Sequence, residues 1–393
     1  MNNINKRSGR FTQQIVIALP FICALFCSNT LYAQTDPTPL LFEGTVGTAP
    51  VVMELSIDSK NVVTGRYFYR KHSLDIALDG VRLPNGDIQL GENQSYGDHQ
   101  NIDMTLHPTH QGWQGEWVGN DPKKIVIQLT AVTTPPKPIY QLSSDATEYD
   151  QIRLSGLALQ KKELTHFDQY ALQWWLEPVS KIKFFRIESG YPADTLALIN
   201  SALTTRQWQE VNSDFACQLG GARNSGADFE QTITPRFMND KVISISVFTS
   251  YYCGGAHPDF NDDPLNLNVK TGKELKLEDV LWLSKTPPDI ALKHEANGDR
   301  TNYDYESKNL APWINTTMAK LYPQNVGSDK KDEDCDYRDP EIWQFPAFYF
   351  TPKGLHLAAS FARVARACDD PDWAVVPWKI VNQHQGQLHL DLP

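Results

Sequence analysis

Apolar and polar residues alternate with a period of two from Leu41 to Val132. This alternation predicts short β-strands that each bury one face. Roughly seven strands are expected, and their apolar positions are Val51, Met53, Leu55 and Ile57; Tyr67 and Tyr69; Leu74, Ile76 and Leu78; Ile88 and Leu90; Ile102, Met104 and Leu106; Trp113 and Trp117; Ile125, Ile127 and Leu129. Turn-forming residues at 58–61, 84–87 and 119–122 are spaced for antiparallel hairpins.

We therefore predict an all-β antiparallel meander over residues 40–132. Closing such a sheet into a small barrel removes its exposed edges. A two-sheet sandwich is the alternative architecture. Three prolines between Thr134 and Ile139 then predict a stiff linker over residues 133–145.

The remaining residues, 146–393, mix both periodicities and predict an α+β domain with an antiparallel sheet. A helix is expected from Pro192 to Trp208, with Asp194 as a plausible cap, and a second helix from Pro312 to Tyr322. Strands are expected at 182–187, 233–237, 242–252 and 265–269, in a hairpin of 345–350 with 355–365, and at 375–378.

The first 33 residues resemble a cleaved secretory signal. Three basic residues precede the apolar stretch from Ile15 to Phe26, and Leu31-Tyr32-Ala33 forms the expected cleavage site. The apolar stretch is shorter than the roughly 20 residues that a membrane-spanning helix needs, and no later segment approaches that length. Lipidation at Cys27 is the competing interpretation, but it is disfavoured because Phe26 is bulky. An exported protein, periplasmic or secreted, is the expectation.

Charge narrows the set of partners. The chain has 36 Lys+Arg and 47 Asp+Glu, a net charge of −11. Removing the three basic residues of the signal leaves 33 against 47, a mature net charge of −14. Nucleic acid is therefore disfavoured as a partner, and a basic protein is permitted.

Four cysteines remain after the signal is removed, and exported cysteines usually form disulfides. Four cysteines allow three pairings. We predict Cys217 with Cys253 and Cys335 with Cys368, because the members of each pair lie 36 and 33 positions apart and flank what resemble neighbouring strands. A zinc site is the weaker interpretation, since no two of these cysteines have C-x-x-C spacing.

The densest group of chemically versatile residues follows the strand that ends near residue 252. The candidate binding residues are Tyr251, Tyr252, Gly254, Gly255, His257, Asp259, Asp262 and Asp263. A histidine beside three carboxylates is suited to be a general base or one ligand of a cation site. The structural alternative is a glycine-rich turn in which His257 donates to a backbone carbonyl and the aspartates are solvated.

A family resemblance lies in the same region. It rests on the motifs Tyr252–His257, Leu267–Leu275 and Leu277–Val280. Together they resemble the exported domain of unknown function at the C-terminus of the lysozyme-sensing anti-sigma factor of Gram-positive bacteria, also found in some cell-wall polysaccharide deacetylases. The resemblance covers about residues 190–393 and implies a domain that binds rather than catalyses, with basic lysozyme as the ligand in the anti-sigma factor. We expect no cytoplasmic or transmembrane part and no deacetylase domain, so neither signalling nor deacetylation is carried over from the resemblance.

Other motifs are weaker. The G-x-S-x-G, H-E-x-x-H and phosphate-loop patterns are absent. Ser180–Lys183 matches S-x-x-K but lacks that family's partner motifs. Trp174-Trp175 is expected to pack in the core or dock a domain rather than stack a sugar, and the acidic residues 329–341 are expected to form a solvated loop.

We predict an exported, non-catalytic binding protein of the cell envelope, without cofactor or metal, that recognises a cell-wall component or a basic wall-acting protein such as lysozyme. Aspartates would steer a cationic partner, and tyrosines would supply buried contact. The alternative is a cell-wall hydrolase that uses His257 as general base. A third reading is a structural protein of the envelope without a discrete ligand. The oligomeric state is left open.

Overall fold

The computed structural model describes residues 39–92, 102–118, 124–134, 137, 142, 146–222, 226–286, 302–326 and 335–390. The expected signal over residues 1–33, the turn at 119–122 and most of the expected linker at 133–145 lie outside these ranges. In the described part of the chain, no helix is both long and apolar enough to cross a membrane.

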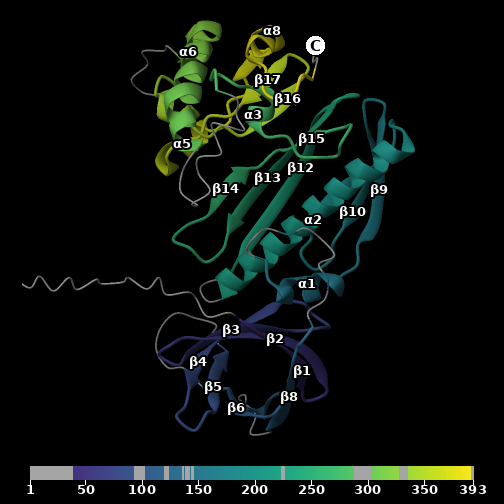
Figure 1. Ribbon diagram of the computed structural model, residues 1–393, viewed down its shortest axis with the longest axis vertical. Helices are drawn as coiled ribbons and strands as arrows, with labels where there is room; N and C mark the ends of the chain where they lie inside the picture. The colour runs from purple at the N-terminus through teal and green to yellow at the C-terminus, as the bar shows by residue number, and fades with distance from the viewer. Residues whose placement is uncertain are drawn as a thin grey trace, which may run out of the picture. The chain divides into compact units, whose positions relative to one another are not determined.

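The first described region is a closed antiparallel β-barrel (Figure 1). Sequential strands pair with one another, and the last strand returns to pair with the first. Its eight described strands are β1 (Leu40–Val46), β2 (Ala49–Ile57), β3 (Val62–Tyr69), β4 (Asp75–Arg82), β5 (Ile88–Glu92), β6 (Met104–Pro108), β7 (Gly112–Trp117) and β8 (Ile125–Ala131). The predicted barrel is confirmed, and the sandwich alternative is not observed.

Side chains from alternate positions fill the barrel interior, as the period of two predicts. Val51, Met53 and Leu55 of β2 are each at most 1% exposed, and every other strand adds buried residues to the same cluster. Two predicted positions are wrong: Leu74 is 48% exposed and Ile102, which precedes the start of β6 at Met104, is 52% exposed. The chain turns at Ser73, whose φ is 61°, and β4 begins only at Asp75.

Helix α1 (Glu148–Ser155) packs on the barrel through a buried ionic network. Arg153 donates to Asp75 of β4 at 2.5 Å and to Asp150 at 2.5 Å, and all three side chains are at most 4% exposed. Arg66 of β3 also pairs with Asp150, at 3.2 Å. The Tyr149 hydroxyl donates to Asp75 at 2.5 Å. Each buried charge therefore has an opposite charge in contact, as burial requires.

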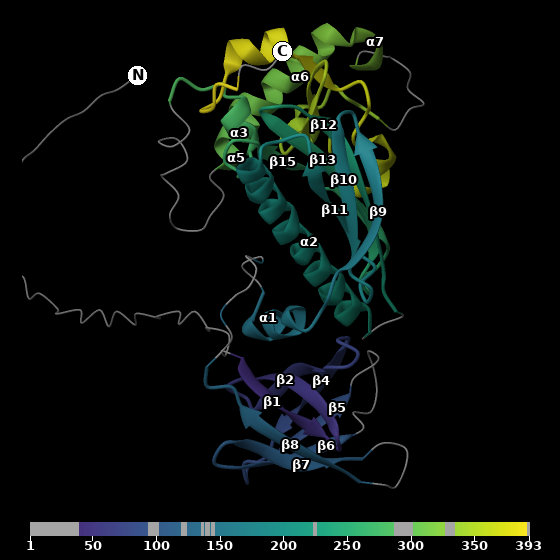
Figure 2. The ribbon, with the colours of Figure 1, turned by 90° about the vertical axis from the view of Figure 1, so that its right-hand side faces the viewer.

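Two further antiparallel sheets pack against one long helix (Figure 2). One contains β9 (Gln160–Phe167), β10 (Tyr170–Leu176) and β11 (Lys183–Ser189); the other contains β12 (Asp228–Met238), β13 (Val242–Tyr252), β14 (Asp259–Asp262) and β15 (Leu265–Asn268). Helix α2 (Ala193–Ala222) places Ile199 and Leu203 in a core shared with both sheets. The expected helix is thus much longer than predicted, and Asp194 lies within its first turn rather than at the cap.

The C-terminal region holds a small sheet and several short helices around a separate apolar core. Trp343, Phe350 and Ile314 are fully buried in it. Its described elements are α3 (Leu277–Val280), α5 (Asn302–Tyr305), η2 (Glu306–Leu310), α6 (Ala311–Leu321), α7 (Pro323–Val326), η3 (Pro340–Trp343), β16 (Phe348–Thr351), β17 (Gly354–Leu357), η4 (Arg363–Cys368), β18 (Val375–Pro377), α8 (Trp378–Val381) and η5 (Asn382–His384). The described residues from 146 onward therefore have the predicted α+β class.

The predicted strand over 355–365 is too long. β17 ends at Leu357, because Leu357 pairs with Phe348, the first residue of its partner β16. Beyond that point no described strand remains for it to pair with, and the chain bends into the 3-10 helix η4.

Both predicted disulfides are present, Cys217–Cys253 and Cys335–Cys368. The reason for the pairing is also confirmed, because Cys217 and Cys253 flank the paired strands β12 and β13, and Cys335 and Cys368 flank the paired strands β16 and β17. Cys217 itself lies on helix α2, so the first bond ties this helix to the residue after β13. The close approach also explains Gly220, since a Cβ there would lie 2.8 Å from the Cys253 carbonyl oxygen.

Candidate functional site

The predicted binding residues do not form one loop. Tyr251 and Tyr252 end strand β13, Asp259 and Asp262 belong to strand β14, and Asp263 follows it. The glycine-rich turn between the strands contains Gly254, with φ of 82°, which favours glycine over residues with a side chain. The structure therefore places the candidate residues along a hairpin whose second strand is β14.

His257 lies on the exposed part of this turn. Among the described residues, no hydrogen bond or ion pair of its imidazole is found. Neither the expected bond to a backbone carbonyl nor an orienting aspartate is observed. The general-base arrangement that the sequence suggested is therefore not assembled here.

Asp259 and Asp263 are each held by arginine. Arg366 of η4 donates to Asp259 at 2.7 Å, and Arg206 of α2 donates to Asp263 at 2.7 Å. Arg206 also pairs with Glu210 at 2.5 Å. These two aspartates are therefore not free charges, because each is paired with a guanidinium group, although the Asp263 side chain remains 65% exposed.

Asp262 has a different environment. Its carboxylate accepts from the backbone N–H of Val247 at 2.9 Å and from the Ser246 hydroxyl at 2.8 Å. Burial raises the pKa of Asp262 despite these hydrogen bonds. No ion pair with lysine or arginine is found for it among the described residues.

Two pockets open on either side of β14, and Phe260, Asn261 and Arg366 line both. The first, which we call the α2 pocket, has a volume of about 600 Å³. Its wall includes the residues Arg206, Glu210, Phe229, Thr249 and Tyr251, with the Cys217–Cys253 disulfide. The second, the β17 pocket, has a volume of about 250 Å³. It is lined by Phe248, Phe345, Asp262, Asp369 and Asp370 and by small residues that include Ala358 and Ala359.

A buried histidine stands behind the β17 pocket. His356 of β17 is 1% exposed, and its ring stacks on Tyr349 with centroids 4.3 Å apart. Its Nε2 lies 3.1 Å from the Pro371 carbonyl, and its Nδ1 lies 3.5 Å from Asp370 Oδ1. Burial lowers the pKa of His356 to about 4 and raises the pKa of Asp370.

Sequence reasoning missed His356 and the acidic pair Asp369-Asp370. His356 stands between two leucines in a strand and looks like part of an ordinary alternation. The carboxylates directly follow Cys368, so the predicted disulfide was a usable signal for their position. Asp262, more than 100 positions earlier in the chain, lines the same pocket, and this proximity had no local signature.

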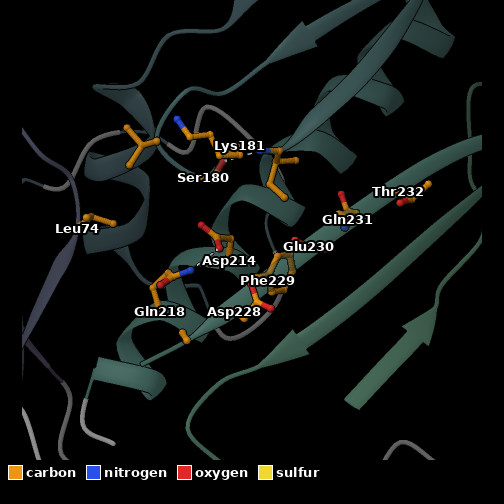
Figure 3. A pocket seen from close by; sticks show the side chains of 13 residues that line it. Leu74, Ser180, Lys181, Asp214, Gln218, Asp228, Phe229, Glu230, Gln231 and Thr232 are labelled. Atoms are coloured by element: carbon orange, nitrogen blue, oxygen red, sulfur yellow. Dashed lines mark hydrogen bonds between the residues drawn. The ribbon is translucent and has the colours of Figure 1, made fainter. Parts of the chain in front are cut away.

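A third pocket of about 600 Å³ lies beside α2 and β12 (Figure 3). Asp214 is 3% exposed and accepts from Gln218 at 3.1 Å. Ser180 also lines this pocket, but Lys183 pairs with Glu163 and lies over Trp174. The S-x-x-K motif therefore does not bring its serine and lysine together for catalysis.

Burial of Asp214 has a consequence for stability. It raises the pKa of Asp214 to about 6, above the usual value for an aspartate. Because the folded pKa is the higher one, this group favours folding at low pH, and that contribution is lost as the pH rises from about 4 to 6. Asp214→Asn is expected to raise the free energy of unfolding at pH 7.5 by about 1 to 2 kcal/mol and to give no gain near pH 4.

Urea denaturation at the two pH values measures this difference. Asp304→Asn is the control, since that side chain is 73% exposed and its substitution should change little at either pH. An Asp214→Asn variant that is equally destabilised at both pH values would contradict the assignment.

Comparisons with known proteins add little to this geometry. No protein-family model matches the chain, and no curated protein matches it. Among solved structures, the chain is similar to a member of the DUF3298 family from Bacteroides fragilis NCTC 9343, with 10% identity. That match covers 58% of this chain and 94% of the other, with a TM-score of 0.32. So distant a similarity assigns neither a family nor an activity.

Proposed function

We propose that this protein is an exported, non-catalytic binding protein of the cell envelope. It would hold a basic wall-acting protein, or a cell-wall component, at the surface formed by strand β14 and its two flanking pockets, which we call the β14 face. The observation that carries the proposal is the pairing of these two open pockets with aromatic rings and carboxylates. Aromatic anchors beside charged groups are typical of the energetic centres of protein interfaces.

The charge of the chain supports a basic partner rather than an anionic one. The mature net charge inferred from the sequence is −14 (33 Lys+Arg against 47 Asp+Glu). A protein of this charge attracts cationic partners over a distance of about 10 Å at moderate salt. The sequence resemblance to the lysozyme-sensing anti-sigma factor supports lysozyme as the first basic protein to test.

Export rests on two supports. The N-terminal sequence has the composition of a secretory signal, and two disulfides are present in the folded chain. Structural disulfides are typical of oxidising compartments outside the cytoplasm.

The hydrolase alternative needs His257 to act as a general base. The exposed His257 side chain contacts no carboxylate among the described residues. Nor does the described part of the chain contain a cluster of three or more metal-ligating side chains that would activate water instead. These findings favour binding over catalysis at the β14 face.

We expect His257→Ala to leave the affinity for a c-type lysozyme within about twofold and the free energy of unfolding within about 0.5 kcal/mol. Titration calorimetry and urea denaturation measure the two quantities. Phe260→Ala is the matched positive variant, because Phe260 lines both pockets, and it should weaken binding by about tenfold or more. If His257→Ala instead abolishes degradation of purified peptidoglycan while the fold is intact, the hydrolase reading is correct.

A further inference from the structure

The β17 pocket is small for a ligand site. Its volume of about 250 Å³ lies below the roughly 300 to 1,000 Å³ typical of pockets for drug-sized ligands. The pocket can enclose a single protein side chain or a chemical group of similar size. The α2 pocket, at about 600 Å³, is more than twice as large.

Phenyl rings frame the β17 pocket. Phe345 is 59% exposed and Phe248 is 39% exposed, and the Phe248 ring lies 5.8 Å from that of Phe260. The face of an aromatic ring attracts cations. In this structure the Arg366 guanidinium lies 4.7 Å from the Phe260 ring centroid, so one face of this ring already holds a cation.

The carboxylates of the pocket are unequally neutralised. Asp369 accepts from Arg366 at 3.0 Å and from the backbone N–H of Phe361 at 2.6 Å. Asp262 and Asp370 form no ion pair with lysine or arginine in the described part of the chain. Burial raises the pKa of both carboxyl groups, and the charge of Arg236 opposes this rise. The Arg236 guanidinium lies over the Tyr349 ring, 5.0 Å from the centroid, and donates to Ser246. Negative charge therefore remains at the pocket wall.

The neighbouring His356 does not donate a hydrogen bond to the Asp370 carboxylate. A carbonyl oxygen only accepts, so the contact with Pro371 requires the proton of neutral His356 on Nε2. Nδ1 is then an acceptor, and it faces Asp370 Oδ1, a second acceptor, at 3.5 Å. Neither of these two buried atoms has a hydrogen-bond partner among the residues that the structure describes. Two buried acceptors without a donor carry an energetic cost that an added donor or cation relieves.

The backbone holds this arrangement in place. Asp370 has φ of 50°, in the left-handed region that residues other than glycine seldom adopt. The neighbouring disulfide partner Cys368 and the bond from the Phe361 N–H to Asp369 fix the chain on the N-terminal side of Asp370. Strained residues retained by their surroundings are often found at ligand sites.

We propose that the β17 pocket receives one cationic side chain, a lysine or arginine of a basic partner protein, with Asp370 as its carboxylate partner and Phe248 and Phe345 packed along its stem. This inference rests on the proposed function and specifies the contact that the β14 face makes. The ammonium or guanidinium group compensates the unpaired charge of Asp262 and Asp370, and the phenyl rings shield it from water.

The test uses the mature, oxidised protein and two probes. The small probe is Nα-acetyl-lysine methylamide, with its Nζ-acetylated form as the neutral control, followed by ligand-observed NMR. The second probe is a c-type lysozyme, followed by titration calorimetry. The variants are Asp370→Asn and Phe345→Ala, with Asp304→Asn as an exposed control, and urea denaturation confirms that each is folded.

We expect the lysine amide to bind at least about tenfold more tightly than its acetylated form. Asp370→Asn should weaken lysozyme binding by about tenfold or more, and Phe345→Ala by about threefold or more. Asp304→Asn should leave lysozyme affinity within about twofold. Because Phe345 is largely exposed, its replacement tests the pocket even if Asp370→Asn fails to fold.

The outcomes separate the two proposals. If lysozyme binds and neither pocket variant weakens it, the β17 pocket inference is overturned and the binding function stands. If the lysine amide binds, and Phe345→Ala weakens it, but lysozyme does not bind, the pocket is supported and lysozyme is the wrong partner. Equal binding of the charged and acetylated amides overturns the inference directly.

Discussion

Replacing Arg153 by methionine is expected to lower the free energy of unfolding by about 3 to 5 kcal/mol. The reason is the environment that Arg153 leaves behind. Asp75 and Asp150 are 1% and 4% exposed, and each accepts from Arg153 at 2.5 Å. Methionine fills similar volume but supplies no donor, so buried carboxylate charge loses most of its compensation.

Arg66 limits the loss without preventing it. Its guanidinium remains 3.2 Å from Asp150 but 3.7 Å from Asp75. Asp75 therefore loses more of its compensating positive charge than Asp150 does when Arg153 is replaced. Adding Asp75→Asn to Arg153→Met should recover part of the lost stability, because it removes the uncompensated charge itself.

Urea denaturation of the single and double variants measures both effects. Arg338→Met is the matched control, since Arg338 pairs with Asp336 at the surface, where both side chains are more than half exposed. Its expected cost is below about 1 kcal/mol. Equal costs for the Arg153 and Arg338 variants would show that the buried network does not stabilise the fold.

The second large effect is expected at the disulfide beside the β14 face. Replacing both Cys217 and Cys253 by alanine should lower the free energy of unfolding by roughly 3 to 4 kcal/mol, because the bond closes a loop of 36 residues in the unfolded chain. The same bond fixes the end of β13 against α2 and lines the α2 pocket. Binding to lysozyme should therefore weaken as well.

Denaturation under oxidising and reducing conditions isolates this contribution. The double variant should lose less stability on reduction than the wild type, because only Cys335–Cys368 remains to be reduced. The corresponding variant of Cys335 and Cys368 is the matched control, with a similar loop of 33 residues. A double variant as stable as the oxidised wild type would contradict the prediction.

The barrel was largely predictable because its strands alternate cleanly. β2 and β3 were visible because their inward residues are apolar at every second position. β1 was missed, since only Phe42 and Val46 of its seven residues are buried. β9 was also missed. None of its residues is fully buried, so its sequence has no apolar face to detect.

The candidate residues from Tyr251 to Asp263 were singled out because tyrosines, glycines and aspartates gather there in the sequence. Their division between two paired strands, β13 and β14, was not predicted. In the folded chain Asp263 pairs with Arg206 of α2, and Asp259 pairs with Arg366 of η4, so neither carboxylate is a free charge. Such contacts join residues more than 50 positions apart in the chain, and no local periodicity encodes them.

The β17 pocket could not be predicted either, because its residues are even further apart in the sequence. Its wall combines Asp262 and Phe260 from one hairpin with Phe345 and Asp370 from segments that follow about 80 to 110 residues later. Each residue alone looks like ordinary surface or core. Only the tertiary structure reveals that aromatic rings and unpaired carboxylates share one cavity.

The most direct test of the proposed function is the retention of the mature, oxidised protein on an immobilised c-type lysozyme across a range of salt concentrations. The proposal predicts specific retention that weakens steeply between about 0.05 and 0.5 M salt, as expected for a protein of net negative charge that attracts a basic partner. Absence of retention by the folded protein, or retention that salt does not change, would contradict it.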